Sequence, residues 1–225
     1  RDLVRSRGLG DVYKRQLFNQ SYAPFKDRVK ACVDSVNNAN AKTGGRSLYI
    51  ANCTADSMEF LERAMTAQEL GAGGIMAAPG LLGLSIIREL SSAPDFHLPI
   101  FLHPCFSGPL VLSADSGVSP FCYYGQFSRL AGADAAIFTS FGGRFPFTEE
   151  VCRKICDGTE TEMGGLRSIF PVPSGGMKWQ LFKKMVQVYG PDAIFLVGGA
   201  LLTESDDLTA NMHFYFEKLN EAVNK

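Results

Sequence analysis

Short apolar runs alternate with stretches of helical periodicity along most of this chain, and this alternation constrains the fold more than any other feature. The six apolar runs are predicted to be strands at 48–51, 74–78, 99–103, 135–139, 168–172 and 193–197. A first helix is predicted to begin at Phe25 and to end at Gly44 and Gly45. A second is predicted to begin at Asp56 or Ser57, with Met58, Leu61 and Met65 on its apolar face. Further helices are predicted at 83–91, 121–131, 148–157, 177–189 and 206–223. Near-continuous apolar strands separated by amphipathic helices indicate a parallel sheet covered on its faces.

Two α/β architectures fit this rhythm, a doubly wound sheet and a (β/α)8 barrel. No GxGxxG sequence follows the first strand, which weakens the dinucleotide-binding alternative. Glycine and polar residues gather instead after the carboxyl ends of the strands, where barrels build their active sites. We therefore predict an incomplete (β/α)8 TIM barrel that holds six of its eight strand–helix units.

Composition excludes several classes of protein. The 225 residues carry 22 basic and 23 acidic side chains, so no positive field points to nucleic acid as a partner. No apolar run reaches the ~18 residues of a membrane span. The six cysteines form no CxxC pair, and Cys152 and Cys156 lack the further ligands of a zinc site, so buried free thiols are expected. Such cysteine usage indicates a reducing, cytoplasmic compartment.

Residues 1–16 (RDLVRSRGLGDVYKRQ) differ from the rest of the chain. They begin without methionine, hold five basic residues and show no apolar period. They resemble a translated sequencing adapter and are interpreted as a non-native tail; a solvated basic tail and a phosphate-binding or targeting arm are the alternatives. The expected division is a tail at 1–16 and a partial barrel domain at 17–225, the C-terminal fragment of a longer protein.

Two glycine pairs late in the chain give the clearest chemical signal. Exposed backbone N–H groups ahead of helix starts bind phosphate, and barrels commonly hold phosphate at the loops after their last two strands. A tight turn without a ligand would explain either pair alone, but pairs on successive loops favour a phosphate site. Its predicted residues are Ser174, Gly175 and Gly176 after the fifth strand and Gly198 and Gly199 after the sixth.

Two further side chains lie at predicted strand ends. Arg144 follows Gly142 and Gly143 after the fourth strand and is predicted to fold over an anionic ligand, with a solvated arginine as the alternative. His103 ends the third strand, where a substrate hydrogen bond and a satisfied, half-buried histidine are equally open interpretations. His97 and His213 are expected at the surface. No GxSxG sequence or metal-spaced histidine pair supports hydrolytic or zinc chemistry.

From about Leu17 to Asn220 the chain resembles the C-terminal barrel of the RuBisCO superfamily, and within it the RuBisCO-like proteins most closely. The resemblance implies that His103 is an active-site histidine and that Arg144 takes the place of the mobile-loop lysine over the reacting carbon. It also implies that the two glycine loops surround one phosphate. The segments that show this resemblance to the family are TGGRSLYIANCTA, RAMTAQELGAGGIM, FLHPCFSG, GADAAIFTSFGGRF, FPVPSGGMKW and YGPDAIFLVGGALL.

Two departures from the family pattern narrow the expected substrate. The arginine that holds a second phosphate in true carboxylases is Pro104 here, and the histidine that ends the sixth barrel strand is Ile137. A pocket without those donors holds a second dianion poorly. The expected substrate therefore carries one phosphate, and ribulose bisphosphate carboxylation is not expected.

The resemblance also implies parts of the site that lie upstream of Leu17. These are a Mg²⁺ site with a carbamylated lysine, an aspartate and an acidic or polar neighbour, and an N-terminal domain that completes the site across a homodimer. Asp206 and Asp207 are interpreted instead as charges at the start of the last helix.

The function expected for the full-length parent is that of a lyase or isomerase acting on a sugar monophosphate through a Mg²⁺-stabilised enediolate. The fragment itself is expected to be inactive. Candidate substrates are methylthio-sugar phosphates and branched keto-acid phosphates, and Ala200, Leu201 and Leu202 after the last glycines favour 3-oxo-isoapionate 4-phosphate decarboxylation. The alternative is a non-catalytic phosphate-binding barrel that has lost its metal site.

Overall fold

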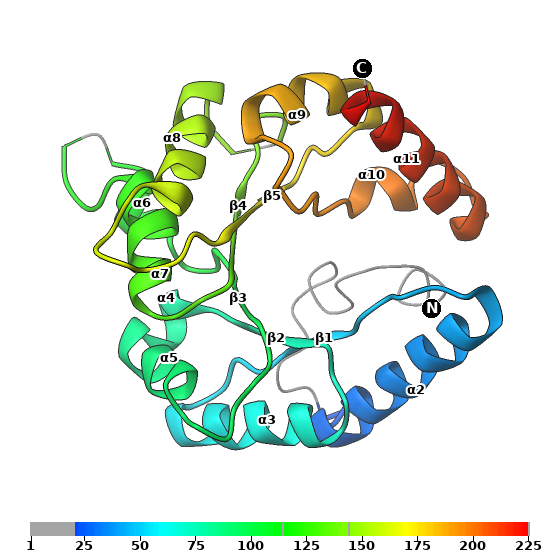
Figure 1. Ribbon diagram of the computed structural model, residues 1–225, viewed down its shortest axis with the longest axis horizontal. Coiled ribbons are helices and arrows are strands. Elements are labelled where there is room, and N and C mark those ends of the chain that lie inside the picture. The colour runs from blue at the N-terminus through cyan, green and yellow to red at the C-terminus, as the bar shows by residue number, and fades with distance from the viewer. Residues whose placement is uncertain (1–20, 114, 144, 225) are drawn as a thin grey trace.

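Five parallel strands form one curved sheet in which each strand pairs with the next along the chain. The computed structural model describes residues 21–113, 115–143 and 145–224. Figure 1 shows the sheet as an inner arc with the helices outside it. The strands are β1 (Ile50–Asn52), β2 (Gly74–Ala77), β3 (Ile100–Leu102), β4 (Ala135–Thr139) and β5 (Phe170–Ser174).

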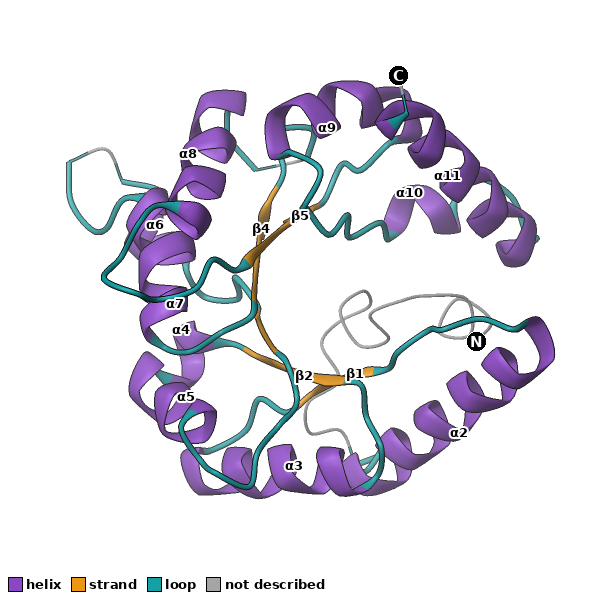
Figure 2. Cartoon of the chain, in the orientation of Figure 1, coloured by secondary structure: helices purple, strands orange, loops and turns teal. Residues whose placement is uncertain are grey.

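Helices connect the strands and cover the outer face of the arc (Figure 2). The α/β prediction is confirmed, because every pair of neighbouring strands is parallel and a helical crossover joins them. Among the residues described, no helix has both the length and the apolarity to span a bilayer. The longer helices are α2 (Phe25–Thr43), α3 (Ser57–Glu69), α5 (Leu84–Ser91), the π-helix η1 (Phe121–Phe127), α8 (Glu149–Glu160), α9 (Phe182–Tyr189) and α11 (Leu208–Val223). The short ones are α4 (Pro79–Leu82), α6 (Gly108–Val111), α7 (Ser128–Leu130), the 3-10 turn η2 (Trp179–Leu181) and α10 (Gly199–Leu202).

The sequence places several helix ends correctly. Helix α2 stops where predicted, because Gly44 follows it with a φ of 66°, a left-handed conformation that glycine adopts without steric cost. Asp207 caps α11 by accepting hydrogen bonds from the N–H groups of Thr209 and Ala210. The interpretation of this aspartate as a helix-start charge is therefore confirmed.

Apolar side chains pack on both faces of the sheet. Successive side chains in a strand point to opposite faces, so Ile137 and Phe138 of β4 lie in different clusters. Phe138 faces the helices η1, α8 and α9, whereas Ile137 lies in the cluster inside the arc. That inner cluster comprises Ile50, Met76, Phe101, Ala135, Ile137 and Val172.

The sixth predicted strand, 193–197, is reduced to a single parallel bridge between Ser174 and Leu196. The N–H groups of Ile194 and Leu196 donate to the carbonyl oxygens of Pro171 and Pro173. Proline has no N–H to donate in return, so half of the ladder that would define a strand is absent. Strand β5 lies at Phe170–Ser174, two positions later than the predicted strand at 168–172.

Two helix predictions need correction. Met58 was expected on the apolar face of α3, but 79% of its surface is exposed. It lies in the first turn of the helix, while Phe60, Ala64 and Ala67 belong to the buried face. The predicted helix at 121–131 is a π-helix followed by the short α7, which gives its side chains a different register from an α-helix.

Candidate functional site

A cavity of about 400 Å³ lies at the carboxyl ends of β3, β4 and β5. The lining is aromatic, aliphatic and hydroxyl-bearing, with one imidazole and one thiol. No Asp, Glu, Lys or Arg is among the described residues that line it. They are His103, Pro104, Cys105, Phe106, Ser107, Gly108, Val111, Leu112, Tyr124, Thr139, Phe145, Phe147 and Ser174.

His103 enters this cavity from the residue that follows β3. Its backbone N–H donates to the carbonyl oxygen of Ala77 at 2.8 Å, so the sheet ladder fixes the position of its Cα. Its Nδ1 accepts a hydrogen bond from the N–H of Cys105 at 3.1 Å. Burial lowers the pKa of the imidazole from 6.5 to about 4. His103 is therefore a neutral imidazole that carries its proton on Nε2.

Ser174 ends β5 and begins the first predicted phosphate loop. Its hydroxyl donates to the carbonyl oxygen of Phe138 at 2.9 Å, which ties the end of β5 to β4. Gly175 and Gly176 follow with φ values of 79° and 66°. A Cβ atom at Gly176 would overlap the carbonyl group of Gly142, so the loops after β4 and β5 are in direct backbone contact.

The second glycine pair lies at the same edge of the sheet. Gly198 and Gly199 come two and three residues after Leu196, which bridges to Ser174. Gly199 is the first residue of α10. The structure thus brings the two predicted glycine loops next to one another, and Ser174 also brings the first loop to the cavity that holds His103.

The remaining predicted positions are placed as follows. Arg144 and residues 1–16 lie outside the described residues. Pro104 lines the cavity and Ile137 belongs to the inner apolar cluster. His97 and His213 are exposed, as predicted. No disulfide joins any of the cysteines that the structure describes, as expected, and Cys53, Cys152 and Cys156 are buried.

Sequence reasoning missed the aromatic and hydroxyl groups that complete the cavity. Tyr124 comes from η1, and its hydroxyl bonds with that of Ser107 at 2.7 Å. Thr139 comes from the last position of β4. The position of Ser107, four residues after His103 in FLHPCFSG, was a usable signal, whereas the placement of Tyr124 depends on a π-helix that no residue pattern announced.

The described residues do not form a Mg²⁺ site by themselves. No group of three or more His, Cys, Asp or Glu side chains that could hold a metal ion is found among them. Because Mg²⁺ prefers oxygen ligands and octahedral geometry, the described lining of the cavity, which holds no carboxylate, does not fit it either. No chemical step is assigned to a metal from these residues.

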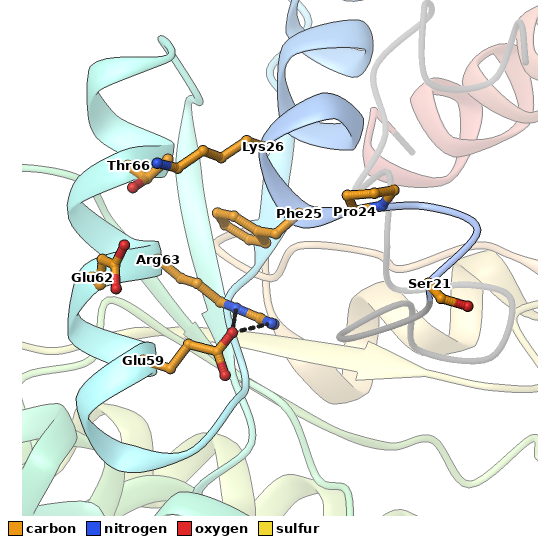
Figure 3. Close-up of a pocket in the computed structure, with 8 residues that line it drawn as sticks. All are labelled: Ser21, Pro24, Phe25, Lys26, Glu59, Glu62, Arg63 and Thr66. Atoms are coloured by element: carbon orange, nitrogen blue, oxygen red, sulfur yellow. Dashed lines mark hydrogen bonds and ion pairs between the residues drawn. The ribbon is translucent and has the colours of Figure 1, made fainter.

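A second cavity, of about 550 Å³, lies between the first turns of α2 and α3 (Figure 3). The buried Arg63 forms an ion pair with Glu59 at 2.7 Å and places its guanidinium 5.1 Å from the centre of the Phe25 ring. Its Nη1 also donates to the carbonyl oxygen of Thr54. These contacts tie α3 to α2 and to the segment after β1, so we interpret this arginine as a structural anchor.

Comparison with known proteins agrees with the architecture. Residues 11–211 match the family model described as ribulose bisphosphate carboxylase large chain, catalytic domain. A solved rubisco-like protein from Alicyclobacillus acidocaldarius superposes with a TM-score of 0.83 at 28% identity, over 92% of this chain and 55% of the other. The fold and the strand-end site thus define part of a (β/α)8 barrel domain. The chain belongs to the catalytic-domain family of the RuBisCO large chain.

Two curated relatives show where in that family the similarity lies. The chain is 34% identical over 216 residues to a 5-methylthioribulose-1-phosphate isomerase from Rhodospirillum rubrum, covering 92% of this chain and 55% of that protein. It is also 34% identical over 185 residues to a 2,3-diketo-5-methylthiopentyl-1-phosphate enolase from Geobacillus thermodenitrificans, covering 82% and 45%. The chain spans about half the length of these relatives. The recognition of a RuBisCO-like protein is confirmed.

Proposed function

We propose that the complete protein is a RuBisCO-like enzyme of the enolase or isomerase type that acts on a sugar monophosphate. This chain supplies the histidine and the phosphate loops of the site. The observation that carries the proposal is the cavity beside His103, whose described lining holds no charged side chain. A second phosphate dianion would be desolvated there with no cationic partner among the described lining residues.

The relatives' names support the same substrate class. Both named substrates are 1-phosphates that end in a methylthio group. An apolar end of this kind fits a cavity that contains Phe106, Phe145 and Phe147. The single phosphate belongs, in this proposal, between the 174–176 loop and Gly198 and Gly199, where backbone N–H groups would bind it.

His103 acts in this proposal as a hydrogen-bond donor. A neutral imidazole with its proton on Nε2 stabilises negative charge that develops on a substrate oxygen when a proton leaves the neighbouring carbon. Arg144 keeps its proposed place over the reacting carbon. The Mg²⁺ ligands, including the carbamylated lysine, are proposed to lie outside the described residues, and the complete protein is proposed to be a cytoplasmic homodimer.

The test is solvent proton exchange on the complete protein. It is incubated in D₂O with 5-methylthioribulose 1-phosphate, 2,3-diketo-5-methylthiopentyl 1-phosphate, 3-oxo-isoapionate 4-phosphate and ribulose 1,5-bisphosphate in turn, and products are followed by NMR. We expect deuterium next to the carbonyl, or an isomerised product, with one of the first two substrates. Decarboxylation of the third would replace the enolase or isomerase assignment. Carboxylation of the bisphosphate, or inertness toward all four, would overturn the proposal.

A matched variant tests the phosphate loops within the same assay. Gly199→Asp adds a carboxylate where the phosphate is proposed to lie, so KM should rise by at least about tenfold through repulsion and lost N–H contacts. Asp192→Asn, at an exposed position, serves as the control for an altered charge. An unchanged KM in Gly199→Asp would remove the phosphate from these loops.

A further inference from the structure

We propose that Tyr124 is a positioning residue for His103, and that it acts through Ser107 and the turn at 104–107. The inference deepens the proposed function, since it rests on His103 as a residue of the site. Neither residue of the Tyr124–Ser107 pair was assigned a role from the sequence. Both line the cavity together with His103.

A chain of short hydrogen bonds joins Tyr124 to the turn. The hydroxyl groups of Tyr124 and Ser107 lie 2.7 Å apart in a buried position. The Ser107 hydroxyl donates to the carbonyl oxygen of Pro104 at 2.6 Å, and the Ser107 N–H donates to the same oxygen at 3.2 Å. The turn is therefore closed by two bonds that converge on one carbonyl.

Counting hydrogens gives this chain a direction. A serine hydroxyl has one proton, and a carbonyl oxygen only accepts, so the Ser107 proton is used on Pro104. The proton between the two hydroxyls must then come from Tyr124. Burial raises the pKa of Tyr124 to about 12, so the phenol keeps that proton throughout the neutral range.

The turn in its closed form presents the Cys105 N–H to Nδ1 of His103. It also holds Phe106 at a φ of 64°, a left-handed conformation that is strained for a residue with a side chain. A strained turn keeps this shape only while its closing bonds are intact. Tyr124 therefore helps to hold the Cys105 N–H in place, and with it the tautomer that leaves the His103 proton on Nε2.

The π-helix is what delivers Tyr124 to this position. Helix η1 packs so closely on α8 that a Cβ atom at Gly125 would overlap the backbone of Gly158. The Tyr124 ring lies against Phe138 and Phe147, with ring centres 6.3 and 6.2 Å apart. Aromatic contacts thus hold the ring independently of its hydroxyl group, so removal of the hydroxyl alone leaves the packing in place. Wide helical turns of this type often occur at functional sites.

The experiment reads the His103 tautomer in the complete protein labelled with ¹⁵N-histidine. The His103→Gln variant identifies the His103 signals. The wild-type protein is expected to show one neutral tautomer, protonated on Nε2, above about pH 5. Tyr124→Phe and Ser107→Ala should each give a mixture of tautomers and a higher pKa for His103, and the double variant should add nothing to either single change.

Tyr123→Phe is the matched control, because it removes the neighbouring hydroxyl in the same π-helix and leaves the chain through Ser107 intact. An unchanged His103 tautomer in Tyr124→Phe would overturn the inference, and so would additive effects in the double variant. A fall in kcat/KM without any change at His103 would mean that Tyr124 contacts substrate directly, which also overturns it. Because the NMR readout needs no turnover, a failure of the proposed function would show separately, as absent exchange beside an intact tautomer response.

Discussion

Burial shifts the pKa of several titratable side chains in and around the cavity. It lowers the pKa of His103 to about 4 and raises the pKa of Tyr124 to about 12. Behind the cavity, burial also raises the pKa of Tyr189 well above its ordinary value and that of Cys152 to about 11. All four groups are neutral at pH 7. A charged ligand at this site must therefore be met by backbone N–H groups or by residues outside those described.

The low pKa of His103 predicts how stability depends on pH. An unfolded histidine binds its proton near pH 6.5, and the folded one binds it near pH 4. Between these values the unfolded state holds more protons on this residue, so the contribution of His103 to the free energy of unfolding falls as the pH drops from 6.5 to 4 and is level above 6.5. Urea unfolding of the complete protein across this range measures the slope.

A pair of variants isolates the contribution of this histidine. His103→Gln should flatten the slope between pH 6.5 and 4, because the group with the shifted pKa is gone. His97→Gln, at an exposed position, should leave the slope as in the wild type. Equal slopes in the wild type and His103→Gln would show that the imidazole is hydrated in the folded state.

At the scale of elements, backbone contact between loops decides what the glycines can tolerate. Gly175 and Gly176 both have positive φ, but an added Cβ atom would meet nothing within 4 Å at Gly175, whereas at Gly176 it would overlap the Gly142 backbone. Gly175→Ala should cost about 1–2 kcal/mol, the price of a left-handed alanine. Gly176→Ala should cost about 1–3 kcal/mol more, because the loop after β4 must move. Thermal and urea unfolding of the two variants gives the comparison, and equal losses would contradict the loop contact.

The strands and helices also show which parts of the fold could be predicted from the sequence. Apolar runs located the five strands, and Gly44 and Asp207 marked helix ends, because these signals are local. The weakened sixth strand was not foreseen. The effect of Pro171 and Pro173 depends on which neighbour their missing N–H groups face, and that is a property of the register. The π-helix likewise depends on the close packing of Gly125 on Gly158, which residues distant in the chain create.

Some residues of the candidate site could likewise be predicted from the sequence, and others could not. Ser174 and His103 were found because strand ends are visible in the sequence and barrels place chemistry there. The structure brings both to one cavity. Tyr124 and Thr139 were missed, since a tyrosine in an apolar stretch and a threonine at the end of a strand look like core residues until the cavity is known.

At the scale of the whole molecule, the described strands form a curved sheet whose two edges differ. Strand β1 pairs with β2, and within the described chain its other side carries no strand (Figure 1). At the other end, the segment at 194–196 is held to β5 through its own N–H groups. Parallel sheets are normally covered on both faces, and unpaired backbone groups at an edge attract other strands.

The 225-residue chain, expressed by itself, is therefore expected to self-associate and to lack a stable monomer. Leu48 lies just before β1, packs beside Gly73 and is 57% exposed, so Leu48→Lys should lower the associated fraction by placing a charge close to the unpaired strand. Leu130→Lys, at a 45% exposed position in α7, is the matched control and should not. Light scattering after size exclusion over a range of concentrations measures the effect. A soluble monomer that melts cooperatively would show that the arc is stable without further strands, and equal effects of the two lysines would assign the association to general apolar surface rather than to the β1 edge.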